Sequence, residues 1–141
     1  MSYDKEMLRA IFNKTNRRCH LCHRRLAFSN YGAHGERGAW ELDHSIPVAE
    51  GGTDHLNNLL PAHTSCNRSK QASSSRSARQ AHGKTRAPMS VTALRRAKVR
   101  NAVAGAFATG LLGARFAGPV GFWIGAIVGA AIAYEVDPEA L

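Results

Sequence analysis

The sequence predicts an α+β fold: a small domain of short strands and helices held together by a metal, followed by a basic linker and apolar helical segments. Three differences in composition support this prediction. Residues 17–70 are dense in Cys, His, Asn and Gly, residues 71–101 are rich in Ser and Arg, and residues 102–134 are apolar and rich in Ala and Gly. At 141 residues, the chain has room for one domain, or for one very small domain with an appendage.

Charge is divided between these regions as unevenly as composition. The chain carries a net charge of +9, and residues 1–101 hold 18 of its 19 Lys and Arg residues against 7 of its 10 acidic residues. The other three acidic residues lie in an acidic C-terminus at residues 135–141. The basic part is therefore suited to a polyanion, and the apolar part needs a separate explanation. A hydrophobic fraction of 44% excludes a wholly disordered chain.

Residues 1–16 predict a short amphipathic helix that packs on the domain that follows it. Met7, Leu8, Ile11 and Phe12 recur there at helical spacing. The opening residues do not form a secretory signal peptide, and disulfides would leave one of the three cysteines unpaired. We therefore expect a reduced, cytoplasmic compartment in which thiolates bind a metal.

The cysteines and one histidine fall into two halves of equal spacing. Cys19 and Cys22 form a Cys-x2-Cys pair, and His63 and Cys66 form a His-x2-Cys pair about 40 residues later. A two-residue gap lets a tight turn present two ligands to one ion, and three thiolates with one imidazole are a common structural zinc set. A domain of about 55 residues has little core, so the zinc would supply folding free energy. Two alternatives stay open: a histidine that directly follows Cys19 or Cys22 replaces His63, or no metal binds.

A carboxylate, an imidazole and an amide predict a second, catalytic metal site. Asp43 and His44 end a short run that we expect to form a strand, and Asn67 directly follows the last cysteine. A carboxylate, an amide oxygen and waters form a set that Mg²⁺ accepts while leaving room for a phosphate oxygen. A histidine beside such a site, with a pKa near neutrality, can take a proton from an attacking water. Taken alone, the Asp-His pair is also compatible with an ordinary hydrogen bond in a turn.

These motifs, in this order, resemble the HNH endonuclease family. The resemblance covers residues 17–70 and rests on Cys19-x2-Cys22, Asp43-His44-x2-Pro47, Gly51-Gly52, Asn58-Leu59 and Cys66-Asn67-x2-Lys70. It implies the ββα-metal fold, in which a β-hairpin and a helix grip one divalent cation, in the subtype that also contains zinc. It also implies metal-dependent hydrolysis of DNA phosphodiester bonds, with one strand nicked per domain.

The resemblance implies a role for each matching residue. His44 would be the general base that activates water. Asp43 and Asn67 would bind the catalytic metal, Mg²⁺ or another divalent cation. Asn58 would brace the loop of the β-hairpin and so orient His44. Arg68 and Lys70, on the helix after the last cysteine, would face the DNA phosphates.

Two positions depart from the pattern of zinc-containing relatives. His63 stands where a second Cys-x2-Cys pair usually begins, and Asn67 stands where the metal set often has a histidine. Histidine is as competent a zinc ligand as cysteine, and asparagine, although a weaker ligand, is common at the second position. Neither departure argues against catalysis. A non-catalytic, zinc-containing module that only binds DNA stays an alternative.

The chain from residue 68 to residue 100 contains ten cations and no acidic residue. Its first part predicts a solvated linker, and residues 91–101 predict a short basic helix. Flexible arms rich in Ser and Arg bind polyphosphates by releasing counterions. We expect the first part to contact DNA through Arg68, Lys70, Arg76 and Arg79. The alternatives are a linker that the cations only make soluble, or a role at a membrane surface.

Residues 102–134 predict a tail of the glycine-zipper type that associates with membrane lipid. Gly121, Gly125 and Gly129 align on one helix face, where small residues let helices approach closely in lipid and allow self-association. Residues 116–134 carry no charge and are about long enough to span a hydrocarbon core. Basic residues before this span and acidic residues after it place the preceding domain in the cytoplasm.

Two other arrangements of the tail stay open. Residues 102–114 are too short to span a bilayer alone but could form a hairpin with residues 116–134, with Arg115 near the turn. A soluble hairpin that packs on itself or oligomerises would need no lipid. If the tail inserts, a further candidate function is a membrane-inserting effector that carries a nuclease domain.

Overall fold

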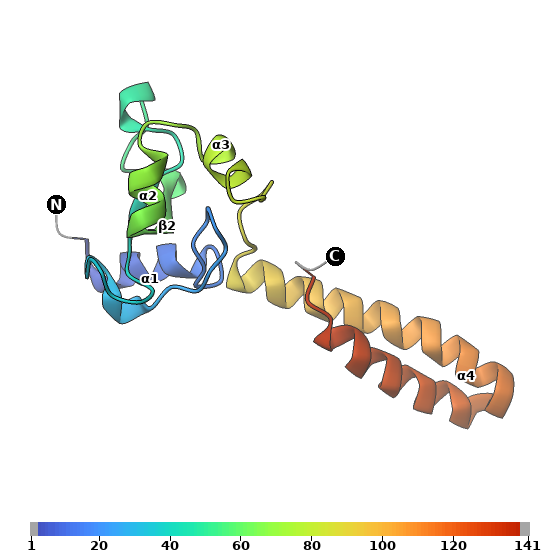
Figure 1. The fold of residues 1–141 in the computed structure, drawn as a ribbon. Helices are drawn as coiled ribbons and strands as arrows, with labels where there is room; N and C mark the ends of the chain where they lie inside the picture. Colours follow the sequence, from blue (N-terminus) through green and yellow to red (C-terminus); the bar gives the residue numbers. More distant parts are fainter. Residues whose placement is uncertain (1–2, 139–141) are drawn as a thin grey trace. The chain divides into compact units, whose positions relative to one another are not determined.

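The computed structural model describes residues 3–138 and divides into two compact units, Met1–Val91 and Thr92–Leu141. Its helices and strands, in chain order, are α1 (Lys5–Asn13), β1 (Trp40–His44), β2 (Leu59–His63), α2 (Thr64–Lys70), α3 (Ser75–Gln80) and α4 (Val91–Glu135). Short 3₁₀ helices at Phe28–Asn30, Val48–Glu50 and Leu56–Asn58 lie in the connections. Figure 1 shows the first unit as strands with short helices and the second as a long helix that folds back on itself.

A two-stranded antiparallel sheet followed directly by a helix forms the centre of the first unit. β1 and β2 pair so that Trp40 lies opposite His63 and His44 lies opposite Leu59. β2 runs into α2 without a loop, since His63 ends the strand and Thr64 begins the helix. α2 contacts both strands. The first unit is therefore the α+β arrangement of β-hairpin and helix that the sequence predicts.

The core of the first unit joins α1 to the sheet. Asp4 caps α1, because its carboxylate accepts the N–H of Met7 at 2.7 Å. The buried ring of Phe12 then lies 5.1 Å from the ring of Trp40, measured between centroids. The buried core residues are Phe12, Cys19, Leu21, Leu26, Trp40, Ala62 and Cys66. Two cysteines belong to this core, so the candidate zinc site and the apolar core form one cluster.

The stretch predicted as a solvated linker contains a short helix instead. α3 begins after Ser74, whose hydroxyl accepts the N–H of Ser77 at 3.2 Å. Ala78 packs against the core, and Ser75 is buried. A serine-rich stretch supplies helix caps as readily as solvated loops. The connection between helices is therefore limited to residues 81–90.

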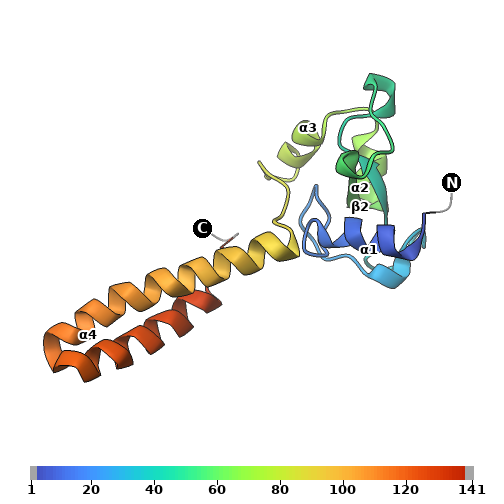
Figure 2. The same ribbon diagram turned by 180° about the vertical axis from the view of Figure 1, so that it is seen from behind.

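α4 is a long helix with a break near its middle. Ala117 (φ −137°) and Gly118 (φ 59°) leave the helical conformation, and Pro119 follows. A positive φ favours glycine, and proline is suited to the first turn of a helix. Both views show the two arms on either side of the break lying side by side (Figure 1, Figure 2). The structure therefore matches the hairpin of residues 102–114 with residues 116–134 that the sequence left open, with the break just after Arg115.

Candidate metal centre and active site

Four side chains gather into one metal-binding cluster in the first unit. The ligand atoms of Cys19, Cys22, His63 and Cys66 all lie within 4.8 Å of one another. The first two come from the loop after α1, the third ends β2, and the fourth lies in the first turn of α2. Separations of this size and this donor set fit a tetrahedral zinc ion. The structure thus brings together the four residues predicted from their spacing, and these residues could hold a structural zinc.

Hydrogen bonds orient His63 as a metal ligand. Its Nε2 lies 3.2 Å from the carbonyl oxygen of Arg25 and donates to it. That leaves Nδ1, 3.4 Å from Sγ of Cys22, with a lone pair directed at the cluster. The backbone N–H of His63 donates to Sγ of Cys19 at 3.3 Å. Contacts of this kind fix the tautomer of metal-binding histidines and support thiolates.

The cluster stabilises negative charge on sulfur. Hydrogen bonds with Cys19 and Cys66 hold the pKa of Cys22 well below its ordinary value. Hydrogen bonds with Cys19 and Cys22 raise the pKa of His63 to about 9. The pKa values of Cys19 and Cys66 are raised, so without an ion the cluster favours one thiolate, on Cys22, whose charge the protonated imidazole of His63 offsets. Zinc binding releases the protons of the imidazole and of the other thiols, so zinc affinity falls in acid.

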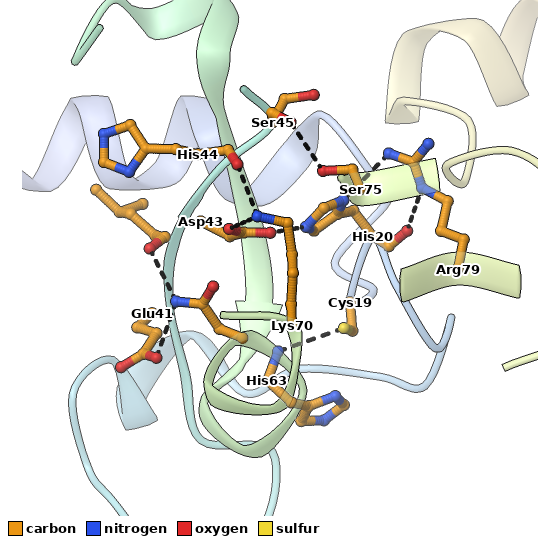
Figure 3. Close-up of polar contacts among 12 residues, drawn as sticks. Cys19, His20, Glu41, Asp43, His44, Ser45, His63, Lys70, Ser75 and Arg79 are labelled. Carbon is orange, nitrogen blue, oxygen red and sulfur yellow. Dashed lines mark hydrogen bonds and ion pairs between the residues drawn. The ribbon is translucent and has the colours of Figure 1, made fainter. Parts of the chain in front are cut away.

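A buried polar network lies beside the zinc cluster (Figure 3). One oxygen of the Asp43 carboxylate accepts from Nζ of Lys70 at 2.9 Å, and the other lies 2.6 Å from Nε2 of His20. Arg79 donates to the carbonyl oxygen of His20 at 3.0 Å and to its Nδ1 at 3.2 Å. A guanidinium only donates, so Nδ1 of His20 accepts. Its Nε2 therefore carries the hydrogen and donates it in a hydrogen bond to the Asp43 carboxylate. Burial lowers the pKa of His20, which agrees with a neutral ring.

The two histidines that follow the zinc cysteines therefore have other partners. His20 is held between Asp43 and Arg79. Nε2 of His23 lies 2.9 Å from the carbonyl oxygen of Arg86. The alternative in which one of them replaces His63 as a zinc ligand does not match this geometry.

A pocket of about 290 Å³ opens beside the network. Asp43 and His44 of β1 line it together with Asn67 and Lys70 of α2. The amide nitrogen of Asn67 donates to the carboxylate of Glu41 at 3.0 Å. This contact occupies the donor side of the amide and leaves its oxygen as an acceptor. Three of the four residues predicted for catalysis, Asp43, His44 and Asn67, thus line one pocket, whereas Asn58 does not line it.

The donors of this pocket fit a hard divalent cation, with one competitor. A carboxylate and an amide oxygen are ligands that Mg²⁺ accepts, and the pocket has room for its waters. However, the ammonium of Lys70 holds one oxygen of Asp43, and it also donates to the carbonyl oxygen of His44 at 3.0 Å. A cation bound to Asp43 therefore competes with this ammonium. Lys70 is only 4% exposed, so the prediction that it faces DNA phosphates is wrong.

His44 lies at the pocket and is held by a carboxylate that the sequence motifs do not include. Its Nε2 lies 2.7 Å from Oδ1 of Asp54, a residue of the loop between the two strands. Both side chains are open to solvent, with exposed fractions of 25% and 51%. When Nε2–H donates to Asp54, Nδ1 keeps a lone pair and can accept a proton.

Asn58 holds together the loop that carries Asp54. Its Oδ1 accepts the N–H of Ile46 at 2.7 Å, and its amide donates to the carbonyl oxygens of Ile46 and Thr53 at 3.0 and 2.9 Å. A Cβ at Gly52 would clash with the carbonyl oxygen of Ile46, so the loop also needs glycine there. The side chain of Asn58 thus bridges the two sides of the loop next to His44.

The four cations predicted to contact nucleic acid fall into two groups. Arg68 and Arg76 are exposed. Lys70 instead faces the interior, where it binds Asp43, and half-buried Arg79 donates to His20. The prediction is wrong for Lys70, because α2 turns this position toward a buried carboxylate that needs compensating charge, and for Arg79 it stays a prediction.

Comparison with known families agrees with this geometry. Residues 19–73 match the family model described as HNH endonuclease. No curated protein and no solved structure matches the chain. The matched segment begins at Cys19 and ends just after α2, so it contains the cysteine and histidine cluster, both strands and the pocket. Residues 19–73 therefore form a domain of the HNH endonuclease family.

Proposed function

We propose that the chain is a metal-dependent endonuclease that hydrolyses DNA phosphodiester bonds. The observation that supports this most is the position of His44, which lines the same pocket as Asp43 and Asn67 and is held by Asp54. A base, oxygen donors for a cation and room for a phosphate are what such hydrolysis requires. The family match supports the same reaction.

The geometry supports a role for His44 as general base. Asp54 accepts from Nε2, so Nδ1 takes the proton of the attacking water, and the carboxylate stabilises the imidazolium that forms. Asp43 and Asn67 would hold the divalent cation. When bound, such a cation stabilises negative charge on the phosphate and on the leaving oxygen. Asn58 keeps the loop of Asp54 in place and so orients the base.

The charge distribution supports DNA as the substrate. Ten cations and no acidic residue lie between residues 68 and 100, and Arg68 and Arg76 are exposed. Cations of this kind contact phosphates, which position a strand without reading its sequence. Within residues 3–138 the proposed base and cation donors occur together in one pocket, so we expect a single domain to nick one strand.

We also propose that the enzyme is cytoplasmic and attached to a membrane through α4. Among the described residues, α4 is long and apolar enough to cross a membrane, judged by length and composition. The cations that precede it favour the cytoplasmic side for the nuclease domain.

One observation favours a second candidate function, a non-catalytic DNA-binding module: Lys70 already compensates the charge of Asp43.

The test is nicking of supercoiled plasmid by the full chain carrying zinc, with Mg²⁺ added stepwise. We expect nicked circles to form only when the divalent cation is present. We expect His44→Ala to reduce the nicking rate by about 10²–10⁴-fold, since the general base is lost. Zinc content should stay unchanged, because His44 lies outside the zinc cluster.

The matched control is His82→Ala, which removes an exposed histidine outside the pocket and should leave nicking unchanged. Undiminished nicking by His44→Ala would contradict the assigned base. A wild-type chain that retards plasmid in a gel but never nicks it, at any Mg²⁺ concentration, would instead establish the DNA-binding module.

A further inference from the structure

We propose that α4 crosses a lipid bilayer twice, as a hairpin, so that the nuclease domain and the C-terminal end lie on the same side. The proposal rests on the membrane attachment proposed above and replaces a single span with two. Its structural basis is the break at Ala117 and Gly118, after which the second arm returns along the first. Figure 2 shows the returning arm from the side opposite to that in Figure 1.

The two arms meet backbone to backbone along a seam of glycines. A Cβ at Gly113 would clash with the carbonyl oxygen of Gly121, and a Cβ at Gly125 would clash with that of Thr109. The hydroxyl of Thr109 donates across the seam to the carbonyl oxygen of Gly125 at 2.5 Å. Lipid tails are as apolar as leucine, so helices in a bilayer associate through close packing and hydrogen bonds of this kind.

Most large apolar side chains of both arms point away from this seam; the exception is Phe122, whose ring packs against Gly110 of the other arm. Exposed fractions between 63% and 85% are found at Phe107, Leu111, Phe116, Trp123, Ile127 and Ile132. The buried positions of α4 are instead occupied by small residues, Ala97, Gly110, Gly121 and Gly129. A hairpin stable in water has the opposite arrangement, with its large apolar residues in the seam. This hairpin therefore requires an apolar surrounding.

The distribution of the exposed side chains favours lipid over a second copy of the chain. Trp123 and Ile124 are adjacent in sequence and both exposed, as are Leu111 and Leu112. Neighbouring helical positions differ in direction by about 100°, so the apolar surface wraps around each arm rather than forming one stripe. A partner helix covers a stripe, whereas a bilayer covers all sides.

The charges mark where such a hairpin would meet the two surfaces of the bilayer. After Arg100, the next charged residues are Arg115, beside the break, and Glu135. About 14 uncharged residues lie between Arg100 and Arg115, and about 19 lie between Arg115 and Glu135. At a rise of about 1.5 Å per residue, the helical arms within these two stretches are roughly 21 and 24 Å long. The hydrocarbon core is about 30 Å thick, a difference that long cationic side chains and local thinning accommodate. Arg115 would then reach the far headgroups.

The base of the hairpin has the character of a headgroup region. Nζ of Lys98 lies 5.2 Å from the centre of the Tyr134 ring. Cations and tyrosine are the residues that gather where a bilayer meets water. The base also carries Arg95, Arg96 and Arg100, against Arg115 alone at the break. This asymmetry places both ends of the hairpin at the cytoplasmic leaflet.

The test uses the full chain with one epitope at each end, expressed in bacteria and exposed to protease. We expect both epitopes to survive in intact spheroplasts and both to be digested in inverted membrane vesicles. A single span would put the epitopes on opposite sides, and that result would overturn the hairpin while leaving the membrane attachment intact. Recovery of the chain in the soluble fraction would overturn the attachment itself, and a soluble oligomer would identify a second copy as the partner.

Variants of the seam test its role. Gly125→Leu adds bulk at the seam, whereas Ala131→Leu adds it at an exposed position of the same arm. We expect Gly125→Leu to lower the fraction of chains with both epitopes on one side severalfold, and Ala131→Leu to leave it unchanged. If Gly125→Leu fails to accumulate, Thr109→Val removes the hydroxyl that bonds Gly125 across the seam and Gly105 within its own arm, and it should lower the same fraction by a smaller factor. Equal fractions for the seam variants and Ala131→Leu would overturn the seam.

Discussion

The two units of this chain place the same residue types in opposite surroundings. In the unit Met1–Val91, Ile11 and Trp40 are fully buried. In the unit Thr92–Leu141, Ile127 and Trp123 are 68% and 67% exposed, while glycines occupy the interior. The first arrangement is stabilised by removing apolar surface from water, and the second is not. The difference shows that hydrophobic content alone does not define a core. What defines it is whether the apolar side chains face the interior or the surface of the unit.

The units also differ in what supplements their packing. The first unit has a small aromatic core, and four candidate zinc ligands and a buried polar network adjoin it. The second unit has a seam of glycines, across which the hydroxyl of Thr109 donates a hydrogen bond to Gly125. We therefore expect chelators and pH to affect the first unit, through its candidate metal site and buried charges, and added volume to affect the second, through its close backbone packing. Each prediction below tests this contrast.

Removal of a zinc ligand should have the largest effect, and only on the first unit. Structural zinc contributes on the order of 10 kcal/mol, comparable with the whole free energy of unfolding of a small domain. We therefore expect Cys66→Ser to unfold the first unit, with loss of the near-ultraviolet circular dichroism of buried Trp40. A Trp123→Phe background makes that signal specific. Zinc content should fall from one ion per chain to nearly none.

The helical signal of α4 is the internal control for that variant. It should persist in phosphatidylcholine and phosphatidylglycerol vesicles, since α4 has none of the four zinc ligands. A wild-type chain that is folded without zinc would refute the site. Loss of the α4 signal together with that of Trp40 would show that the two units are not independent.

Loss of the buried ammonium should have the next largest effect. Lys70→Met leaves Asp43 buried with one partner fewer, a change that costs about 3–5 kcal/mol for buried pairs. Urea unfolding followed by the fluorescence of Trp40 measures it. Lys5→Met, at an exposed position, is the matched control and should change the free energy of unfolding by less than about 0.5 kcal/mol. Equal midpoints for the two variants would contradict the network.

One substitution made in both units compares them directly. Ile11→Ala empties a fully buried position and should lower the free energy of unfolding of the first unit by about 2–5 kcal/mol. Ile127→Ala lies in the second unit and creates no cavity, because its side chain is exposed. It should therefore leave the free energy of unfolding of the first unit unchanged. It should also leave the sidedness of the two epitopes unchanged. A large effect of Ile127→Ala on sidedness would mean that this side chain packs on protein rather than lipid.

Features set by local spacing could be predicted from the sequence. The candidate zinc ligands form two pairs, each separated by two residues, and Asp43 and His44 are neighbours in the sequence. Predicting either group therefore needed no knowledge of the fold. The helix near the N-terminus followed from apolar periodicity. The break in α4 was only one of the arrangements that the sequence left open, because proline after Ala-Gly can end a helix or merely kink it. α3 was missed because serine and arginine suit solvated linkers and helix surfaces equally.

Partners that only the fold brings together could not be predicted. Lys70 is 27 residues from Asp43, His20 is 23 residues from it, and no motif pairs them. Asp54 lies in the loop between the strands, ten residues beyond His44, and no spacing rule connects a loop carboxylate to the base. Glu41, which orients Asn67, looked like an ordinary polar residue of a strand. These contacts depend on strand register and on the helix that packs against it.

The smallest predicted effect is a pH dependence that originates in His20. Burial lowers the pKa of this histidine, whereas in the unfolded chain it titrates near 6.5. Above that pH both states hold the neutral ring. As the pH falls below about 6.5, the unfolded chain binds a proton that the folded chain refuses, so the free energy of unfolding decreases toward the lower, folded pKa.

His20→Gln isolates this contribution, because its amide can still donate to Asp43 but does not titrate in this range. One proton changes the free energy of unfolding by at most about 1.4 kcal/mol per pH unit. Between pH 7.5 and 5.5 the zinc-loaded wild type should therefore lose roughly 1 kcal/mol more than the variant, measured by urea unfolding at each pH. Subtracting the two curves removes the acid release of zinc, which both chains share. Parallel curves would mean that folding leaves the pKa of His20 unchanged, and a wild type that loses less than the variant would mean that His20 is protonated in the folded chain and pairs with Asp43 as an ion.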